Sequence, residues 1–213
     1  MKAILFDFDG TLADTLPNIY HSFKSIFKTY DQSNFSSEEI MKMFGPPETE
    51  IIDLHLQHED KESAKEDYYH EYEKNHSLYV KRNEEITEVL HTLKDNGVKL
   101  GVVTGKSKRS LGLSLKELGM ENIFSVMITG NDVKNPKPDP EGIEMAIKKL
   151  NLKKTDAIYI GDSDSDIEAG NRAEITAYAA QWLPNFETAE YDHQPKERIR
   201  SVSEFKDIIQ EAN

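Results

Sequence analysis

From residue 81 onward, short apolar runs alternate with amphipathic helical segments, a pattern that few folds accommodate. These runs and a further apolar run at the N-terminus predict strands at residues 3–6, 99–103, 125–128, 157–160 and 175–179. The amphipathic segments predict helices at residues 84–96, 107–118, 141–150, 164–172 and 203–212. Strands that alternate with helices form right-handed crossovers and a parallel sheet covered by helices on both faces. The predicted fold class is therefore α/β.

Residues 15–80 follow a different pattern, with much charge and no strand signal. We expect four helices here, at residues 17–30, 37–44, 48–56 and 62–79. The Gly-Pro-Pro sequence at 45–47 separates two of them, because proline and glycine interrupt helices. The simplest organisation is a core domain, residues 1–14 and 81–213, with a Rossmann-like parallel sheet. An all-helical cap domain, residues 15–80, interrupts this core after its first strand.

Composition excludes several classes of function. The 213 residues carry a formal net charge of −13, which argues against nucleic acid as a partner because its phosphates would be repelled. The chain has no cysteine, hence no disulfide, no thiolate nucleophile and no cysteine-based zinc site. The apolar run after Lys2 is too short for a signal peptide, and no stretch approaches the ~18 apolar residues of a membrane helix. We therefore expect a cytoplasmic protein without a membrane partner.

Two aspartates stand where the first predicted strand ends. Asp7 follows the strand, and Asp9 lies on the same side of the chain because strand side chains alternate with a period of two. Gly10 and Thr11 then allow a sharp turn. Two carboxylates that point the same way repel each other, so they favour a cation between them, and magnesium is the common choice where phosphates also bind. Taken alone, a polar strand end followed by a turn explains the same residues equally well.

Three later segments place polar residues at the same predicted edge. Thr104 and Gly105 join a strand to a helix and form a natural anion cradle, or simply a helix cap. Three prolines within five residues hold Lys137 in a stiff loop, which is also compatible with a rigid surface turn. Asp162 directly follows a strand, and Asp166 lies one helical turn further on. In parallel sheets, ligands bind beyond the carboxyl ends of the strands.

The order of these segments resembles the four motifs of the haloacid dehalogenase superfamily. They are an Asp-x-Asp-Gly-Thr strand end, a Thr strand end, a framed lysine and a Gly-Asp-x-x-x-Asp strand end. The resemblance covers the whole chain, including the helical insert after the first motif. It implies that Asp7 attacks phosphorus and forms an aspartyl-phosphate. It also implies that Asp9 protonates the leaving oxygen and later activates water.

The same resemblance implies a magnesium cofactor and a phosphate site. Magnesium would be bound by Asp7, by the main-chain carbonyl of Asp9 and by Asp162, while Asp166 would support these ligands from behind. The phosphoryl oxygens would be held by Thr104 and Gly105. Lys137 would neutralise the nucleophile and the transferring phosphoryl group, since phosphoryl transfer depends mainly on positioning and charge stabilisation.

Asp9 narrows the choice within the superfamily. Dehalogenases lack a second aspartate here, and phosphonatases place a small residue at this position. What remains are phosphatases and phosphomutases, and the Thr-Gly-Lys, Lys-Pro-Asp-Pro and Gly-Pro-Pro stretches look most like phosphoglycolate phosphatases and related pyrophosphatases. We expect a magnesium-dependent phosphatase acting on a small phosphorylated metabolite, either a phosphoglycolate-like phosphomonoester or pyrophosphate, as a monomer or a weak homodimer. The alternative is a phosphomutase of sugar phosphates, similar to β-phosphoglucomutase.

Some details stay open at this point. The loop at 45–48 is either the tip of the cap that faces the substrate, with Lys42 as the nearest cap cation, or an ordinary turn between helices. Related sequences often have Ala-Gly where this chain has Ala173-Glu174, so the turn before the last core strand must accept a side chain. A signalling receiver domain is excluded because no aspartate ends the strand at 99–103. A P-loop is excluded because the glycines at 101 and 105 are too close together.

Overall fold

The computed structural model describes residues 1–211. Within them, the strands form one sheet in the order β3-β2-β1-β4-β5-β6, and every neighbouring pair is parallel. The strands are β1 (Ala3–Phe6), β2 (Lys99–Val103), β3 (Val126–Ile128), β4 (Ala157–Gly161), β5 (Thr176–Ala180) and β6 (Arg198–Ile199). The predicted α/β class with a parallel sheet is confirmed.

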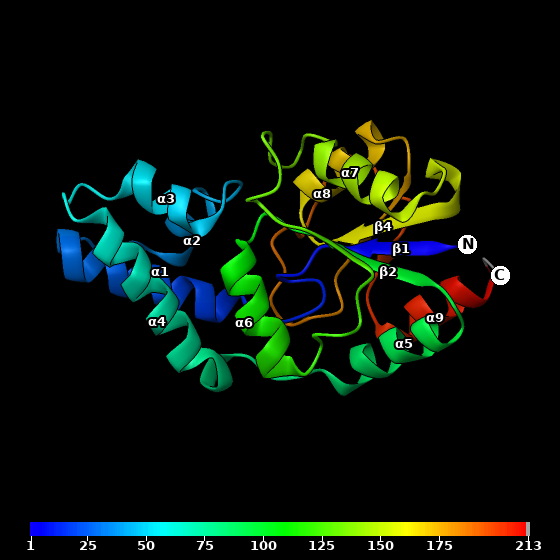
Figure 1. Ribbon diagram of the computed structural model, residues 1–213, viewed down its shortest axis with the longest axis horizontal. Helices are drawn as coiled ribbons and strands as arrows, with labels where there is room; N and C mark the ends of the chain where they lie inside the picture. Colours follow the sequence, from blue (N-terminus) through cyan, green and yellow to red (C-terminus); the bar gives the residue numbers. More distant parts are fainter. Residues whose placement is uncertain (212–213) are drawn as a thin grey trace.

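Helices cover both faces of this sheet (Figure 1). The helices are α1 (Leu16–Asp31), α2 (Ser37–Met41), α3 (Glu48–His55), α4 (Lys61–Tyr79), α5 (Glu84–Asp95), α6 (Lys108–Leu118), α7 (Glu141–Leu150), α8 (Asp164–Arg172) and α9 (Val202–Glu211), with a 3₁₀ turn η1 (Lys154–Asp156). Helices α5, α6 and α9 pack on one face, and α7 and α8 pack on the other. In the described part of the chain, no helix is both long and apolar enough to span a membrane.

The central strand β1 shows why this sheet is apolar on both sides. Ile4 and Phe6 point into the cluster formed with α5, α6 and α9, whereas Ala3 and Leu5 point into the cluster formed with α7 and α8. All four side chains are fully buried. A strand that is covered on both faces must be apolar throughout, so the uninterrupted run before Asp7 is the signature of a central parallel strand.

Helices α1 to α4 lie beyond the carboxyl ends of the strands, and α4 packs against α6 (Figure 1). They share their own apolar cluster, to which α1 contributes Leu16, Ile19, Phe23 and Phe27 at helical spacing. Such a cluster is what a distinct cap domain at residues 15–80 would need. The division of the chain into core and cap domains stays a prediction.

The ends of several elements differ from expectation. Helix α2 stops at Met41 rather than at residue 44, because the chain then forms tighter turns in which the amides of Met43 and Phe44 donate to the carbonyls of Ile40 and Met41. Strand β6 (Arg198–Ile199) was missed, since a two-residue edge strand leaves no periodic pattern. The last helix was expected to end at Ala212, a position outside the described residues.

Two turns near the sheet follow their sequence signals. Helix α6 begins after Ser107, whose hydroxyl accepts a hydrogen bond from the amide of Ser110, and ends at Gly119 with a left-handed φ of 66°. The turn before β5 accepts an exposed side chain at Glu174, which adopts a φ of 59°. The Ala-Glu departure noted in the sequence is therefore accommodated by a left-handed residue.

His76 of α4 gives a testable pH dependence of stability. Burial, aided by the nearby Lys106 charge, lowers the pKa of His76 to about 4. The neutral ring then stabilises the fold above the unfolded pKa of about 6.5, and this contribution is lost as the pH falls from 6.5 toward 4. We expect His76→Gln to remove about 1–3 kcal/mol of the acid-induced loss in the free energy of unfolding. Urea unfolding at several pH values measures this, with the exposed His70→Gln of the same helix as control.

Candidate active site

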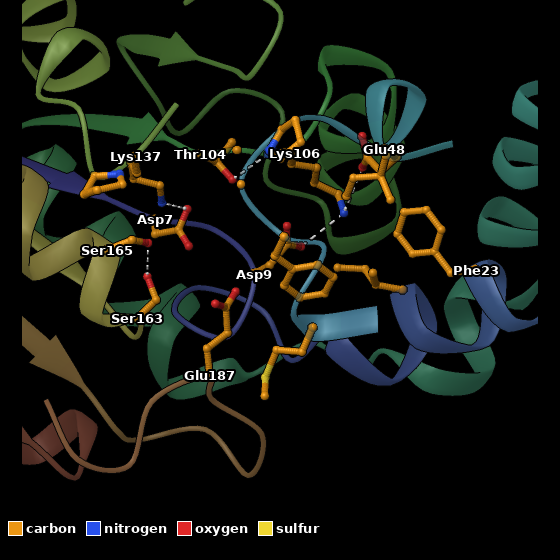
Figure 2. A pocket seen from close by; sticks show the side chains of 18 residues that line it. Asp7, Asp9, Phe23, Glu48, Thr104, Lys106, Lys137, Ser163, Ser165 and Glu187 are labelled. Carbon is orange, nitrogen blue, oxygen red and sulfur yellow. Dashed lines mark hydrogen bonds and ion pairs between the residues drawn. The ribbon is translucent and has the colours of Figure 1, made fainter. Parts of the chain in front are cut away.

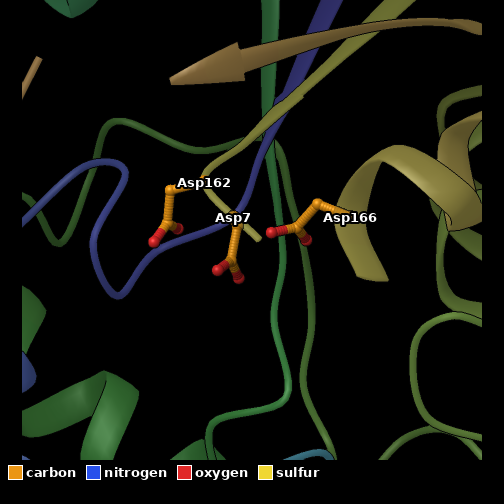
Figure 3. Close-up of side chains that lie close together, drawn as sticks. All are labelled: Asp7, Asp162 and Asp166. Carbon is orange, nitrogen blue, oxygen red and sulfur yellow. The ribbon is translucent and has the colours of Figure 1, made fainter. Parts of the chain in front are cut away.

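A cavity of about 300 Å³ lies between the carboxyl ends of the strands and helices α1 to α3 (Figure 2). Its walls include five of the residues predicted from the sequence: Asp7, Asp9, Thr104, Gly105 and Lys137. Asp162 and Asp166 lie on either side of Asp7 (Figure 3). The structure therefore brings all seven predicted residues to one place.

Parallel pairing explains why these residues meet. Asp7 follows β1, Thr104 follows β2, and Asp162 follows β4, and β1 lies between the other two strands. The carboxyl ends of parallel strands share one edge, so three segments far apart in the sequence deliver polar side chains to the same site. Lys137 reaches this edge from the loop between β3 and α7.

Lys137 joins two of the buried acids. Its Nζ lies 2.9 Å from Oδ1 of Asp7 and 2.5 Å from Oδ1 of Asp166, and it also contacts the hydroxyl of Tyr159 at 3.3 Å. Burial opposes the charge of Lys137, but Asp166 and Asp7 outweigh it and raise the pKa of the lysine well above its usual range. Lys137 is therefore a permanent cation next to the predicted nucleophile.

Asp7, Asp162 and Asp166 form a compact acidic group (Figure 3). One carboxylate oxygen from each lies within 4.8 Å of the others, and all three residues are buried. Asp162 accepts hydrogen bonds from the hydroxyl of Thr11 at 2.8 Å and from the amide of Glu187 at 2.7 Å. Burial raises the pKa of Asp162 well above its usual range, and it raises the pKa of Asp7 to about 7 against the pull of Lys137.

Two glycines make room for these acids. A β-carbon at Gly10 would collide with the carboxylate of Asp162, and one at Gly161 would collide with the side chain of Asp166. Gly10 also adopts a φ of 74°, which L side chains rarely take. The glycines of the Asp-Gly-Thr and Gly-Asp motifs are thus steric requirements of the acidic group.

Buried negative charge exceeds buried positive charge at this site. Glu187 adds a further carboxylate to the cavity wall, and burial, with Asp166 and Asp7 nearby, raises its pKa to about 8. Burial and the neighbouring carboxylates raise these pKa values because both disfavour the charged form. A hard divalent ion with oxygen ligands would supply the missing charge, so the donor set fits magnesium.

The family model of haloacid dehalogenase-like hydrolases matches residues 4–180. The chain belongs to this family. Pyrophosphatase PpaX of Bacillus pumilus (strain SAFR-032) is 32% identical over 212 residues, which cover 98% of this chain and 96% of that protein. PpaX of Listeria monocytogenes serotype 4b (strain CLIP80459) is 33% identical over 214 residues, which cover 99% of this chain and 97% of that protein. CbbY from Rhodobacter sphaeroides, solved in complex with phosphate, has the same fold, with a TM-score of 0.83 at 22% identity and 96% coverage of both chains.

The family assignment confirms the resemblance inferred from the sequence and places the chain among the phosphatases of the haloacid dehalogenase-like hydrolases. It leaves the role of each site residue, the metal and the substrate to be proposed.

Lys106 is a buried cation at the site of this haloacid dehalogenase-like hydrolase, and the sequence motifs do not predict a role for it. Lys106 has no exposed side-chain surface, and its Nζ lies 3.1 Å from Oδ1 of Asp9 and 3.7 Å from Oε1 of Glu48. It also sits 4.4 Å from the centre of the Tyr72 ring. Lys106 belongs to the Thr-Gly-Lys stretch. Its position at the site is set by contacts with Glu48 of α3 and Tyr72 of α4, which no local sequence pattern indicates.

The loop at 45–48 faces the cavity, as one of the two hypotheses required. Gly45, Pro46 and Glu48 all line it. Lys42 was expected to accompany them, but it is exposed at the end of α2 and does not line the cavity. A lysine from outside the cap segment, Lys106, contacts the loop at Glu48.

Proposed function

We propose that this chain is a magnesium-dependent phosphatase that hydrolyses small phosphomonoesters or pyrophosphate through an aspartyl-phosphate intermediate. The observation that carries the proposal is the carboxylate of Asp7, buried at the cavity wall and paired with Lys137 at 2.9 Å. The PpaX pyrophosphatases, similar over nearly the whole chain, support it.

Asp7 is proposed as the nucleophile. Its oxygen would form a bond to phosphorus while the bond from phosphorus to the leaving oxygen breaks. A carboxylate and a phosphate repel each other, so the attack requires positive charge close by. Lys137 supplies part of that charge, because its ammonium group lies against Asp7 at the point of attack.

Asp9 is proposed as the proton donor and later the base. The hydroxyl of Thr15 donates a hydrogen bond to Oδ1 of Asp9 at 2.5 Å, and Lys106 contacts the same oxygen. Because Thr15 and Lys106 both contact Oδ1, Oδ2 of Asp9 is the oxygen that would pass a proton to the leaving group. The same oxygen would later take a proton from water.

Magnesium would be held by the carboxylates of Asp7 and Asp162 and by the main-chain carbonyl of Asp9. When bound, it would neutralise charge on the phosphoryl oxygens during transfer. Both oxygens of Asp166 already accept hydrogen bonds, from Lys137, Tyr159 and Ser163, which suits a supporting role. Thr104 and Gly105 would bind the phosphoryl oxygens at the cavity wall.

The helices at 15–80 are proposed to act as a cap on this site. They cover the cavity opposite the strand ends, so they would exclude water and select the leaving group. The substrate is proposed to be a small phosphorylated metabolite of the cytoplasm.

The test is phosphate release from a panel of phosphomonoesters and pyrophosphate, with magnesium and with excess chelator. We expect chelation to reduce release by at least about 10²-fold, because the buried acids then lack their counter-charge. Magnesium should also raise the melting temperature of the free protein, which reports binding without catalysis. Release that is unaffected by chelator would contradict the metal requirement. Interconversion of sugar phosphates that depends on a bisphosphate and releases no phosphate would establish the phosphomutase instead.

A further inference from the structure

Lys106 is a buried cation without a role of its own in the proposed reaction. Its amide donates a hydrogen bond to the hydroxyl of Thr104 at 3.2 Å, so its backbone is fixed where β2 ends. Its side chain has no exposed surface, and within residues 1–211 its ammonium group makes no well-directed hydrogen bond. Such a group is held by charge. The closer of its two carboxylate neighbours is Asp9, at 3.1 Å from Nζ to Oδ1, against 3.7 Å to Glu48.

The carboxylate of Asp9 is held through one of its two oxygens. Oδ1 accepts the hydrogen bond from Thr15 at 2.5 Å and lies against Lys106. Thr15 directly precedes α1, whereas Lys106 follows β2, so two separate segments restrict the rotation of this carboxylate. They leave Oδ2 for the proton that Asp9 is proposed to transfer, since a proton on Oδ1 would face an ammonium group.

Lys106 is itself placed by the helices at 15–80. Its Nζ faces Oε1 of Glu48 in α3 and lies 4.4 Å from the centre of the Tyr72 ring in α4. Oε2 of Glu48 accepts a hydrogen bond from the amide of Ser107 at 2.9 Å, which fixes this carboxylate. Figure 2 shows the ammonium group between Asp9 and Glu48. The place of Lys106 beside Asp9 therefore depends on the helices lying where they do.

We infer that Lys106 is a positioning residue for Asp9 and supports protonation of the leaving group. The inference rests on the proposed phosphatase function. As Asp7 bonds to phosphorus, the bond from phosphorus to the leaving oxygen breaks, and the proton on Oδ2 of Asp9 passes to that oxygen. Asp9 is left as a carboxylate, and the ammonium group of Lys106 already lies beside the charge that forms. Lys106 acts through Asp9, because its buried side chain has no surface that could touch a substrate.

This role makes the benefit of Lys106 depend on the leaving group. An alkoxide is a poor leaving group, so an alkyl phosphate needs the proton from Asp9. A nitrophenolate is stable as an anion and departs without that proton. A lysine in direct contact with the leaving group would have the opposite preference, because its charge would favour the departing anion.

The test compares kcat/KM of the wild type and Lys106→Met for benzyl phosphate and para-nitrophenyl phosphate, with magnesium. The two esters are similar in size, and kcat/KM reports the formation of the aspartyl-phosphate but not its later hydrolysis. We expect a loss of about 10²-fold on benzyl phosphate, the scale of general acid catalysis, and of less than about tenfold on para-nitrophenyl phosphate. Lys108→Met, at an exposed lysine of α6, is the matched control and should keep both values.

Three results would overturn the inference. Equal losses on both esters would mean that Lys106 acts through packing alone, and unchanged values would mean that Asp9 does not need it. A larger loss on para-nitrophenyl phosphate would indicate direct contact with the leaving anion. A wild-type enzyme that releases phosphate from neither ester, nor from any other member of the panel, would defeat the proposed function and this inference with it.

A second variant keeps the inference testable if Lys106→Met fails to fold. Loss of the lysine leaves Glu48 as a buried carboxylate without a counter-charge, which is destabilising. Lys106→Met combined with Glu48→Gln removes that charge, so the double variant should fold and show the same selective loss on benzyl phosphate. Glu48→Gln alone keeps Lys106 beside Asp9 and should retain the wild-type ratio of the two kcat/KM values. A wild-type ratio in the double variant would contradict the positioning role.

Discussion

Asp7→Asn is expected to lower phosphate release by at least about 10⁴-fold, the scale seen when a nucleophile is removed. Asparagine has nearly the same shape as aspartate, so the geometry of substrate binding is kept. Its neutral amide is a much weaker nucleophile than a carboxylate and does not form the bond to phosphorus. Steady-state release with the best substrate of the panel measures the loss. Full activity in this variant would mean that another group attacks phosphorus.

The same variant should not be less stable in the absence of metal. Burial raises the pKa of Asp7 to about 7 despite the opposing charge of Lys137, so the fold prefers the neutral acid. A raised folded pKa stabilises below the unfolded pKa of about 4, and this contribution is lost as the pH rises to 7. Asparagine does not ionise, so Asp7→Asn keeps its free energy of unfolding as the pH rises. At about pH 8 we expect the variant to be about 1–3 kcal/mol more stable than wild type.

Urea unfolding without magnesium measures this gain, with the exposed Asp95→Asn as control. A marked destabilisation would show that the Asp7–Lys137 ion pair outweighs the cost of burying the charge. Loss of activity with gain of stability would be hard to explain by misfolding, and it is the pattern expected of a strained catalytic group.

The fold was predictable because its determinants are local. An uninterrupted apolar run indicates a central strand, and residues 3–6 are buried on both faces of the sheet. A glycine after an amphipathic segment indicates a helix end, and Gly119 ends α6 in a left-handed conformation. Asp7, Thr104 and Asp162 were recognised because each directly follows a strand, and parallel pairing then brings them together. Only the geometry of the sheet is needed for that step.

The cap end of the cavity was not predictable, because it depends on contacts between distant segments. Glu48 matters only since it meets Lys106 and the amide of Ser107 across the boundary between helices and sheet. Glu187 lies in a loop without a periodic pattern and reaches the site because its amide bonds to Asp162. Neither position carries a local signal, so the leaving-group side required the structure.

Lys137→Met is expected to harm stability as much as activity. The lysine lies against Asp7 and Asp166, and its charge holds the pKa of Asp166 below the usual range although burial acts in the opposite direction. Removing one partner of a buried ion pair leaves uncompensated charge and costs about 3–5 kcal/mol. We expect activity to fall by about 10²–10³-fold, since one source of charge stabilisation at phosphorus is lost. The exposed Lys134→Met is the control.

The pH and metal dependence of this deficit separate charge from packing. Asp166, with its lowered pKa, stabilises the wild type above pH 4 and loses that contribution as the pH falls below 4. Without Lys137 this contribution is absent, so the gap in the free energy of unfolding between variant and wild type should persist at neutral pH and shrink as the pH falls below 4. Magnesium should close part of the gap at neutral pH, because a divalent ion beside Asp7 and Asp162 supplies the positive charge that the lysine no longer provides. A deficit that is the same at every pH and unaffected by magnesium would mean that Lys137 acts through packing alone.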